Sequence, residues 1–222
     1  QQSVLAQIEH NTSQDNSSLA LLKAKVISTS SINDSVSESL IITPSVQDLA
    51  FLQYTSGSTG NPKGVMVSHG NCVANSAQLK ITHHQTDSSV VTSWLPIYHD
   101  MGLIGPFFQS IYTGCLSVIF SPVAFIKTPL SWLRLIYNVQ SSCSGAPNFA
   151  YQLCVDAFSE EKMEGVDLSC WKVAYSGAEP IQKNTIEKFI ETYKEYGFNP
   201  NAFFPVYGMA EHTLMISAGT LG

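Results

Sequence analysis

Apolar and polar positions alternate along most of the chain in short runs that predict both strands and helices. Runs rich in β-branched and aromatic residues predict strands, and they lie at residues 49–54, 65–68, 89–95, 115–120, 171–176 and 202–207. Apolar residues at helical spacing predict helices at residues 70–80, 101–112, 129–139, 147–158 and 182–196. Several strands are apolar on both faces, as expected for a sheet that helices cover on each side. The pattern therefore predicts an α/β fold.

The first 45 residues differ from this pattern. After a short helical stretch, residues 11–18 and 28–39 are polar and low in complexity. We interpret residues 1–45 as a polar N-terminal lobe, the remains of an upstream subdomain. Residues 46–222 form the densely structured part of the chain in this interpretation.

The charge balance disfavours several classes of function. Lys and Arg total 11 against 17 Asp and Glu, a net charge of -6, whereas a surface that binds nucleic acid needs a broad positive field. No apolar run approaches the roughly 18 residues of a membrane span, and the N-terminus lacks the pattern of a secretory leader. The sequence predicts a cytoplasmic protein with no nucleic-acid partner and no membrane span.

The cysteines and histidines give little support to a disulfide framework or a zinc site. The five cysteines are odd in number and include no CxxC pair, so we expect reduced, mostly buried thiols. His83 and His84 are the only close pair of histidines, and adjacent residues point to different faces of a regular element. We expect this pair to lie in a solvated loop.

Residues 54–64, YTSGSTGNPKG, concentrate glycines, hydroxyls and one lysine between two predicted strands. A Walker A loop does not fit, because Pro62 stands where that motif needs glycine and Lys63 is followed by Gly64 and a strand. Glycines still let backbone N–H groups turn toward an anion, and hydroxyls and a lysine add donors and charge. A plain hairpin turn is the other interpretation, but hairpin loops typically have about two to five residues. The predicted phosphate-binding residues are Thr55, Ser56, Gly57, Ser58, Thr59, Gly60 and Lys63.

With its flank, the loop resembles the phosphate-loop signature of the adenylate-forming superfamily, which includes acyl-CoA synthetases, peptide-synthetase adenylation domains and luciferases. Four later segments follow in the family's order: SWLPIYHDMGLIG, SGAPNFAYQLC, VAYSGAEPI and FFPVYGMAEHTL. They are similar to one branch, the fatty acyl-AMP ligases found as loading domains of polyketide and peptide synthases. The resemblance runs from about residue 48 to residue 217. It implies the layered α-β-α subdomains of an adenylate-forming N-terminal domain.

The resemblance also implies that the protein uses ATP and Mg²⁺, and it assigns roles to single residues. Tyr207 would stack on adenine, Glu211 would bind Mg²⁺, and His99 would place the substrate carboxylate with Lys63 as the second catalytic residue. Ala210 stands where many relatives carry threonine, and alanine is usual in the acyl-AMP ligase branch. The implied nucleotide-binding residues beyond the loop are Ser176, Gly177, Ala178, Glu179, Pro180, Tyr207, Gly208 and Met209.

Without the family, the same residues leave alternatives open. His99 and Asp100 interrupt an apolar run and need partners, so His99 fits a satisfied core histidine as well as a substrate contact, with Asp100 as a structural hydrogen-bond partner. Glu211 at an apolar strand-helix junction offers the hard oxygen ligand that Mg²⁺ takes. Five apolar residues fit either the wall of an alkyl tunnel or the core: Trp94, Met101, Ile104, Phe149 and Met209.

The implied function is ATP-dependent activation of a fatty acid to an acyl-adenylate, followed by transfer to the phosphopantetheine thiol of an acyl carrier protein. A fatty acyl-CoA synthetase and a non-catalytic nucleotide- or acyl-binding module are the alternatives. The family's hinge and catalytic lysine lie beyond the last motif. We therefore expect this chain to be a fragment of the large N-terminal domain, incomplete at both ends, with the missing C-terminal domain as its partner and with weak or no activity alone.

Overall fold

The computed structural model describes residues 43–55 and 63–219. The chain divides into two compact units, residues 1–43 and 44–222. The predicted polar lobe at 1–45 therefore lies outside the described residues, except for its last three positions. The five cysteines are all free thiols, and Cys143 and Cys154 are buried.

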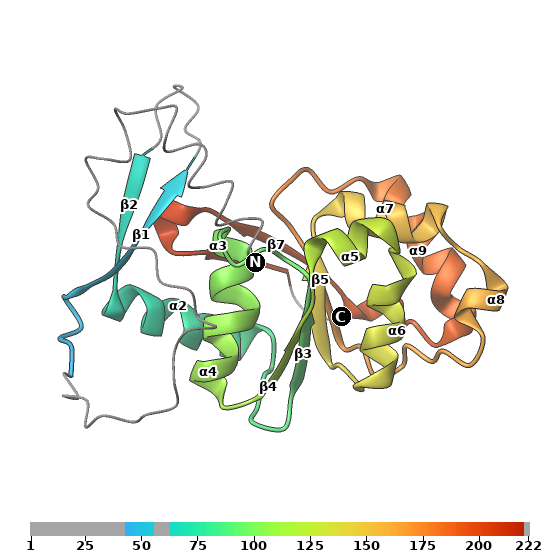
Figure 1. The fold of residues 1–222 in the computed structure, drawn as a ribbon, viewed down its shortest axis with the longest axis horizontal. Coiled ribbons are helices and arrows are strands. Elements are labelled where there is room, and N and C mark those ends of the chain that lie inside the picture. The colour runs from blue at the N-terminus through green and yellow to red at the C-terminus, as the bar shows by residue number, and fades with distance from the viewer. Residues whose placement is uncertain (1–42, 56–62, 220–222) are drawn as a thin grey trace, which may run out of the picture. The chain divides into compact units, whose positions relative to one another are not determined.

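A six-stranded sheet forms the centre of the second unit, with the strand order β4-β3-β5-β6-β7-β8 (Figure 1). The neighbouring strands from β4 to β7 run parallel, and β8 pairs antiparallel with β7. The strands are β3 (Val90–Ser93), β4 (Leu116–Ile119), β5 (Cys143–Ala146), β6 (Val173–Ser176), β7 (Phe203–Gly208) and β8 (Met215–Ala218). The predicted α/β fold is confirmed, and its sheet is mainly parallel.

Helices cover both faces of this sheet (Figure 1). On one side lie α2 (His69–Thr82) and the continuous helical run of α3 (Asp100–Gly102), η3 (Leu103–Phe108) and α4 (Gln109–Thr113). On the other side lie α5 (Pro122–Lys127), α6 (Leu130–Asn138), α7 (Asn148–Asp156), α8 (Glu160–Met163) and α9 (Lys183–Tyr193). Short 3-10 segments η4 (Lys194–Tyr196), η5 (Pro200–Ala202) and η6 (Ala210–His212) flank β7.

A separate antiparallel pair, β1 (Leu49–Thr55) and β2 (Lys63–Ser68), precedes the sheet. Its register pairs Thr55 with Lys63, so both ends of the glycine-rich loop are fixed opposite each other. The predicted placement of this loop between two adjacent strands is confirmed. Residues 56–62 of the loop lie outside the described residues.

Local sequence explains two elements near the cavity described below. Ser68 caps α2: its hydroxyl accepts from the Asn71 N–H at 3.1 Å, and the Asn71 side chain accepts from the Ser68 N–H at 3.0 Å. Pro106 lacks an N–H, and the run at η3 adopts a π-helix around it. A predicted single helix at 101–112 is therefore three consecutive pieces with one widened turn.

The core has two parts. The larger lies around the sheet and under α6, α7 and α9, where the indole rings of Trp132 and Trp171 approach with centroids 5.2 Å apart. The smaller consists of Leu79, Ile104 and Met215, which join α2, η3 and β8. This smaller core borders the cavity at the candidate site.

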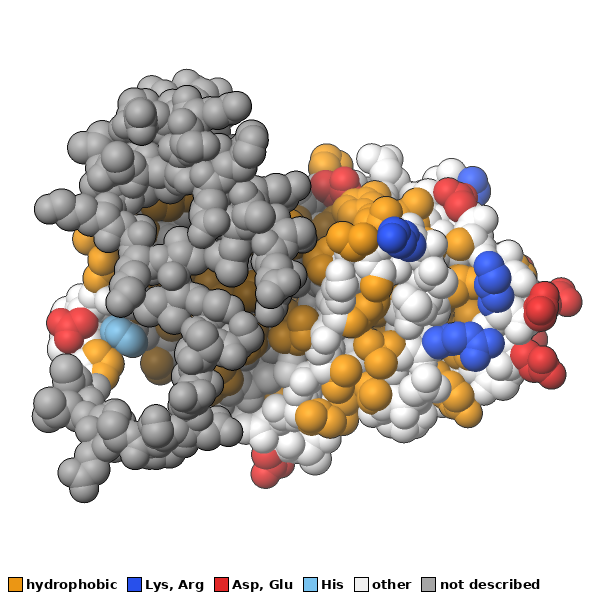
Figure 2. Space-filling model, in the orientation of Figure 1, with side chains coloured by type: hydrophobic (Ala, Val, Ile, Leu, Met, Phe, Trp, Pro, Cys, Tyr) orange, Lys and Arg blue, Asp and Glu red, His pale blue; other side chains and the backbone are white. Residues whose placement is uncertain are grey.

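The visible surface mixes apolar and charged side chains. In Figure 2 hydrophobic side chains spread over the middle of the visible face, and charged side chains of both signs gather toward the end where α8 lies. Within the described part of the chain, no helix has the length and apolar character that crossing a bilayer requires.

Candidate active site

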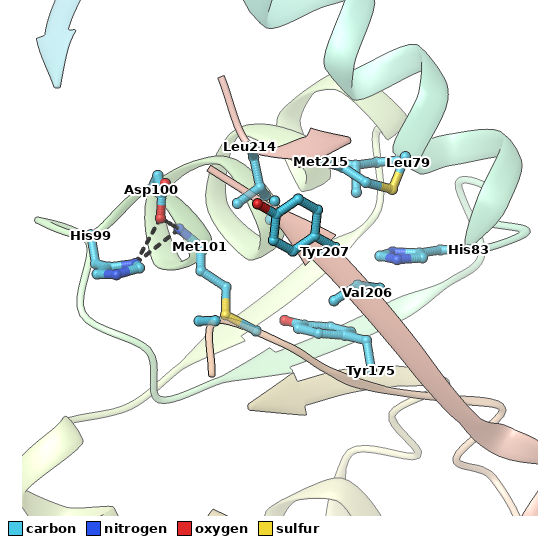
Figure 3. A pocket seen from close by; sticks show the side chains of 13 residues that line it. Leu79, His83, His99, Asp100, Met101, Tyr175, Val206, Tyr207, Leu214 and Met215 are labelled. Carbon is cyan, nitrogen blue, oxygen red and sulfur yellow. Dashed lines mark hydrogen bonds and ion pairs between the residues drawn. The ribbon is translucent and has the colours of Figure 1, made fainter. Parts of the chain in front are cut away.

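A cavity of about 190 Å³ opens where the ends of β6 and β7 meet α2, η3 and β8. Its lining comes from segments far apart in sequence, as Figure 3 shows. The lining residues are Leu79, His83, His99, Asp100, Met101, Gly105, Tyr175, Ala178, Val206, Tyr207, Gly208, Leu214 and Met215. Four predicted site residues are among them: His99, Ala178, Tyr207 and Gly208.

We call His99, Asp100, Ala178 and Tyr207 the mouth of the cavity, because three of the four are well exposed. The Tyr207 residue is 61% exposed, the His99 side chain is 55% exposed, and Ala178 is exposed as well. Ala178 has φ 67°, a left-handed conformation that costs a non-glycine residue energy and is typical of functional turns. The tight turn after β6 therefore lies beside β7, the strand that carries Tyr207.

His99 and Asp100 form a hydrogen-bonded pair at the mouth. The His99 Nδ1 lies 2.8 Å from Asp100 Oδ1, and the Met101 N–H donates to the same Oδ1 at 2.6 Å. The Met101 nitrogen also lies 3.2 Å from His99 Nδ1, but one ring nitrogen cannot donate and accept together. We infer that His99 Nδ1 carries a proton and donates it in a hydrogen bond to Asp100 Oδ1. This hydrogen bond is the main reason why the pKa of His99 is raised. The predicted structural role of Asp100 fits this geometry, and the role of His99 toward substrate stays a prediction.

The turn after β6 shows structural contacts at several predicted nucleotide-binding residues. A Cβ at Gly177 would come within 2.6 Å of the Val206 carbonyl, and a Cβ at Gly208 would overlap the Leu214 backbone, so both glycines are needed for close strand packing. The Glu179 carboxylate accepts from the Phe149 N–H at 2.6 Å, in the first turn of α7. Pro180 precedes α9, whose first residue is Lys183.

Two further predicted residues lie beside the cavity without lining it. Ser176 is fully buried, and its hydroxyl has no hydrogen-bond partner among the described residues. Met209 is 40% exposed and follows β7. Whether these residues contact a nucleotide stays a prediction.

Of the predicted phosphate loop, the structure describes Thr55 and Lys63. They face each other at the end of the β1–β2 pair from which the loop departs, and Lys63 is exposed. Ser56, Gly57, Ser58, Thr59 and Gly60 lie outside the described residues. Strand β2 contacts η6, which carries Glu211, so the lysine strand and the predicted metal ligand lie in neighbouring elements (Figure 1).

Glu211 is exposed in η6, and none of the ion pairs among the described residues includes it. The buried Asn75 of α2 anchors the adjoining chain: its side-chain N–H donates to the Met215 carbonyl at 2.9 Å and its oxygen accepts from the Met215 N–H at 3.2 Å. Asn75 also reaches the His212 carbonyl at 3.4 Å. An asparagine inside an amphipathic helix is the only sequence signal for this supporting residue.

The opposite end of the cavity is buried. We call Leu79, His83, Tyr175 and Met215 the inner end, since each of these residues is less than a tenth exposed. The expectation of a solvated pair at His83–His84 is wrong for His83, which is 7% exposed and ends α2 as its C-cap. His84 is exposed, with φ 48°. Adjacency in sequence gave no sign that tertiary packing separates the two rings.

Burial lowers the pKa of His83 to about 4, with a smaller contribution from His84, so the His83 imidazole is neutral at neutral pH. Its ring stacks on Tyr175, with centroids 5.5 Å apart and 7° between the planes, and Phe204 packs edge-on at 5.4 Å. Burial likewise raises the pKa of Tyr175, which keeps its phenol protonated. The inner end therefore carries two uncharged polar side chains in apolar surroundings.

The five apolar residues considered for a tunnel wall separate in the structure. Met101 lines the cavity, while Trp94 and Ile104 belong to the core. Phe149 and Met209 are part-exposed and outside the cavity lining. The remaining apolar wall comes from residues that sequence alone did not indicate: Leu79, Val206, Leu214 and Met215.

The family model described as AMP-binding enzyme matches residues 3–221, so the chain belongs to this family. The medium-chain-fatty-acid–[acyl-carrier-protein] ligase TtuA of Teredinibacter turnerae is 43% identical over 173 residues, which are 78% of this chain and 27% of TtuA. The probable long-chain-fatty-acid–AMP ligase FadD30 of Mycobacterium tuberculosis is 41% identical over 179 residues, 78% of this chain and 31% of FadD30.

Among solved structures, the fatty acyl-adenylate ligase of L. pneumophila in complex with acyl adenylate and pyrophosphate is similar with a TM-score of 0.78 and 49% identity. The match covers 81% of this chain and 32% of that chain. The chain therefore spans between 27% and 32% of the length of these proteins. The predicted resemblance to the fatty acyl-AMP ligase branch is confirmed by these relatives.

Proposed function

We propose that this chain is the part of a fatty acyl-AMP ligase that binds ATP and the acyl chain. The observation that carries the proposal is a cavity that joins His99, Tyr207 and an apolar interior in a chain of the AMP-binding family. A flat aromatic ring at an exposed mouth suits a nucleotide base, and an apolar interior suits an alkyl chain. The name of TtuA, a fatty-acid–[acyl-carrier-protein] ligase, and the acyl adenylate and pyrophosphate bound by the L. pneumophila ligase support the same substrates.

The proposed reaction has two steps. A carboxylate oxygen of the fatty acid attacks the α-phosphorus of ATP, an O–P bond forms, and the bond to the β-phosphate breaks with loss of pyrophosphate. The carrier thiol then gives its proton to water and attacks the acyl carbon, a C–S bond forms, the acyl C–O bond to the phosphate breaks, and AMP leaves. Holding the carboxylate in line with the α-phosphorus supplies much of the rate, and His99 at the mouth is placed to orient it.

The loop side chains and Glu211 would hold the phosphates and their metal ion. Thr55 and Lys63 stand at the root of the predicted phosphate loop, and Lys63 would neutralise charge on the leaving pyrophosphate. The exposed Glu211 carboxylate, which has no ion-pair partner among the described residues, fits Mg²⁺ as a hard oxygen ligand. Bound with ATP, Mg²⁺ would supply positive charge to the phosphate oxygens.

The cavity size favours acyl chains of medium length. A cavity of 150 Å³ accommodates benzene, so the 190 Å³ found here corresponds to roughly eight non-hydrogen atoms. With the carboxylate held at the exposed mouth, the seven carbons beyond the carboxyl group of octanoic acid match this volume. The relatives alone do not fix the length, because TtuA is named for medium chains and FadD30 for long ones. We propose octanoic acid and its near neighbours as substrates, with an acyl carrier protein as the acceptor.

ATP–pyrophosphate exchange tests this function in the full-length enzyme with fatty acids of four to sixteen carbons. We expect exchange to peak near eight carbons. The acceptor is then decided by supplying coenzyme A or pantetheinylated carrier protein and detecting which thiol is acylated. If none of the fatty acids supports exchange although ATP binds tightly, the non-catalytic binding module is favoured. Acylation of coenzyme A alone would favour the acyl-CoA synthetase.

Glu211→Gln tests the proposed metal ligand. The amide keeps the size of the side chain but removes its charge, so we expect the Mg²⁺ concentration for half-maximal exchange to rise and kcat to fall about 100-fold. Glu164→Gln is the control, because this exposed carboxylate follows α8 and lies outside the cavity lining. Unchanged Mg²⁺ dependence in Glu211→Gln would remove Glu211 from the metal role.

A further inference from the structure

The inner end of the cavity contains two buried polar atoms without partners. The Nε2 atom of His83 and the hydroxyl of Tyr175 are inaccessible to solvent and make no hydrogen bond with any described residue. Their residues are 7% and 5% exposed, and both line the cavity (Figure 3). Buried polar groups in folded proteins are almost always hydrogen-bonded, so two orphaned groups on residues that line one cavity indicate missing partners.

The surrounding structure holds both side chains in position. A Cβ at Gly145 of β5 would overlap the Tyr175 ring, so the absence of a side chain there makes room for this tyrosine. The Tyr175 ring in turn stacks on His83, and Phe204 packs against the edge of His83. The two polar atoms therefore belong to a packed site built from α2, β5, β6 and β7.

The chemistry of the pair restricts what it can bind. A neutral imidazole and a protonated phenol each offer one donor and one acceptor. Leu79 and Met215 complete the inner end, and no charged side chain lines it. A carboxylate or an ammonium group would be buried there without an opposite charge, which is strongly disfavoured. An uncharged oxygen, as in a hydroxyl or a ketone, offers a hydrogen-bond partner to a neutral imidazole or a phenol without burying a charge.

We propose that His83 and Tyr175 form a specificity site for the far end of the acyl chain, and that the preferred substrate is a medium-chain acid with a hydroxyl or ketone oxygen near its terminus. The inference rests on the proposed function, because the carboxylate end of the same acid is held at the mouth by His99. A methyl terminus would leave both polar groups without partners, and a site built to hydrogen-bond a hydroxyl discriminates strongly against the analogue that lacks it.

The test compares 8-hydroxyoctanoic acid with nonanoic acid in ATP–pyrophosphate exchange by the full-length enzyme. The two acids have the same number of non-hydrogen atoms, so chain length does not contribute. We expect kcat/KM to be at least about tenfold higher for the hydroxy acid. Octanedioic acid, which places a charge at the inner end, should be a poor substrate.

The variants Tyr175→Phe and His83→Phe keep an aromatic ring and remove the polar atom. In each we expect the ratio of kcat/KM values for the two acids to fall by about tenfold, mainly through the hydroxy acid. Tyr193→Phe is the matched control: it removes another buried phenol, one that donates to the Cys154 carbonyl and lies outside the cavity lining. Its ratio should equal that of the wild type.

Equal or better turnover of nonanoic acid by the wild type would overturn the inference and leave the proposed function intact. The same holds if the preference survives in both variants, which would mean that a retained water occupies the site. If the variants do not fold, octanoic acids with the hydroxyl at carbon 6, 7 or 8 decide: preference for one position supports the site, and equal rates contradict it. Exchange with none of the acids would contradict the proposed function itself.

Discussion

The mouth and the inner end of the cavity each carry a histidine, and their surroundings act on the two imidazoles in opposite directions. At the mouth, the hydrogen bond to Asp100 raises the pKa of the half-exposed His99. At the inner end, burial lowers the pKa of His83 to about 4. One ring type therefore provides a group that takes up a proton readily and a group that stays neutral. In the proposed function, this difference would separate the handling of charge at the mouth from the recognition of an uncharged chain at the inner end.

The largest expected change in stability comes from His83, whose burial makes the free energy of unfolding depend on pH. The folded-state pKa lies below the unfolded value of 6.5, so only the unfolded chain takes up a proton as the pH falls through this window. The contribution of His83 to stability is fully present above pH 6.5 and is lost on acidification; between pH 7 and pH 4.5 the loss should be roughly 2 kcal/mol. Urea unfolding at both pH values measures it.

His83→Phe should remove this loss while keeping the ring stacked on Tyr175. His84→Asn is the control, because His84 is exposed and its positive φ suits asparagine. An equal pH dependence in His83→Phe and the wild type would show that His83 is accessible to protons in the folded state. The contrast between the two ends of the cavity would then disappear.

The second prediction removes the imidazole at the mouth. We expect His99→Ala to lower kcat for acyl-adenylate formation about 100-fold, since misplacement of the reacting carboxylate by about 1 Å has a cost of this size. The loss should be similar for acids of every length and terminus, because His99 would act on the end they share. A loss confined to hydroxy acids would indicate that His99 contacts the terminus of the acid and not its carboxylate.

These predictions rest on features that the sequence revealed unevenly. The alternating pattern predicted β1, β2, β3, β4, β6 and β7, but β5 and β8 were missed. Strand β5 reads CSGA, four small residues without the β-branched or aromatic signal, and it is buried because its neighbours pack closely against it. Strand β8 has only four residues and is set by its pairing with β7 and by the clamp from Asn75.

The site shows the same limit. Motifs located the mouth, because the turn at 176–180, SGAEP, belongs to a segment that resembles a family motif. The inner end was not predicted, since His83 and Tyr175 come together only when the end of α2 packs over β6. Side chains that meet through tertiary packing leave no spacing signal in one sequence.

The third prediction concerns a substitution at Gly105 that narrows the cavity. Gly105 lines the cavity, and a Cβ there would have only Leu214 within 4 Å, at an ordinary contact distance of 3.7 Å. Gly105→Val should therefore fill part of the cavity and shift the preference toward acids shorter by two or three carbons, lowering kcat/KM for octanoic acid about tenfold. Gly105→Ala should give a smaller shift in the same direction. An unchanged chain-length profile in both variants would show that the acyl chain lies elsewhere.

The smallest expected effect concerns Asp100 and the proton on His99. Asp100→Asn removes the carboxylate that raises the pKa of His99, so that pKa should fall, which NMR titration of the imidazole measures. Because the pKa of His99 is raised in the folded state, the pair stabilises the protein below pH 6.5 and this contribution is lost as the pH rises through the folded value. At a half-exposed site it amounts to only a few tenths of a kcal/mol, about the size typical of surface pairs. Acidification therefore lowers the stability that the inner end contributes and raises the stability that the mouth contributes. If the pKa of His99 does not change in Asp100→Asn, Asp100 is not the cause of the raised pKa, and the contrast between the two histidines loses its basis at the mouth.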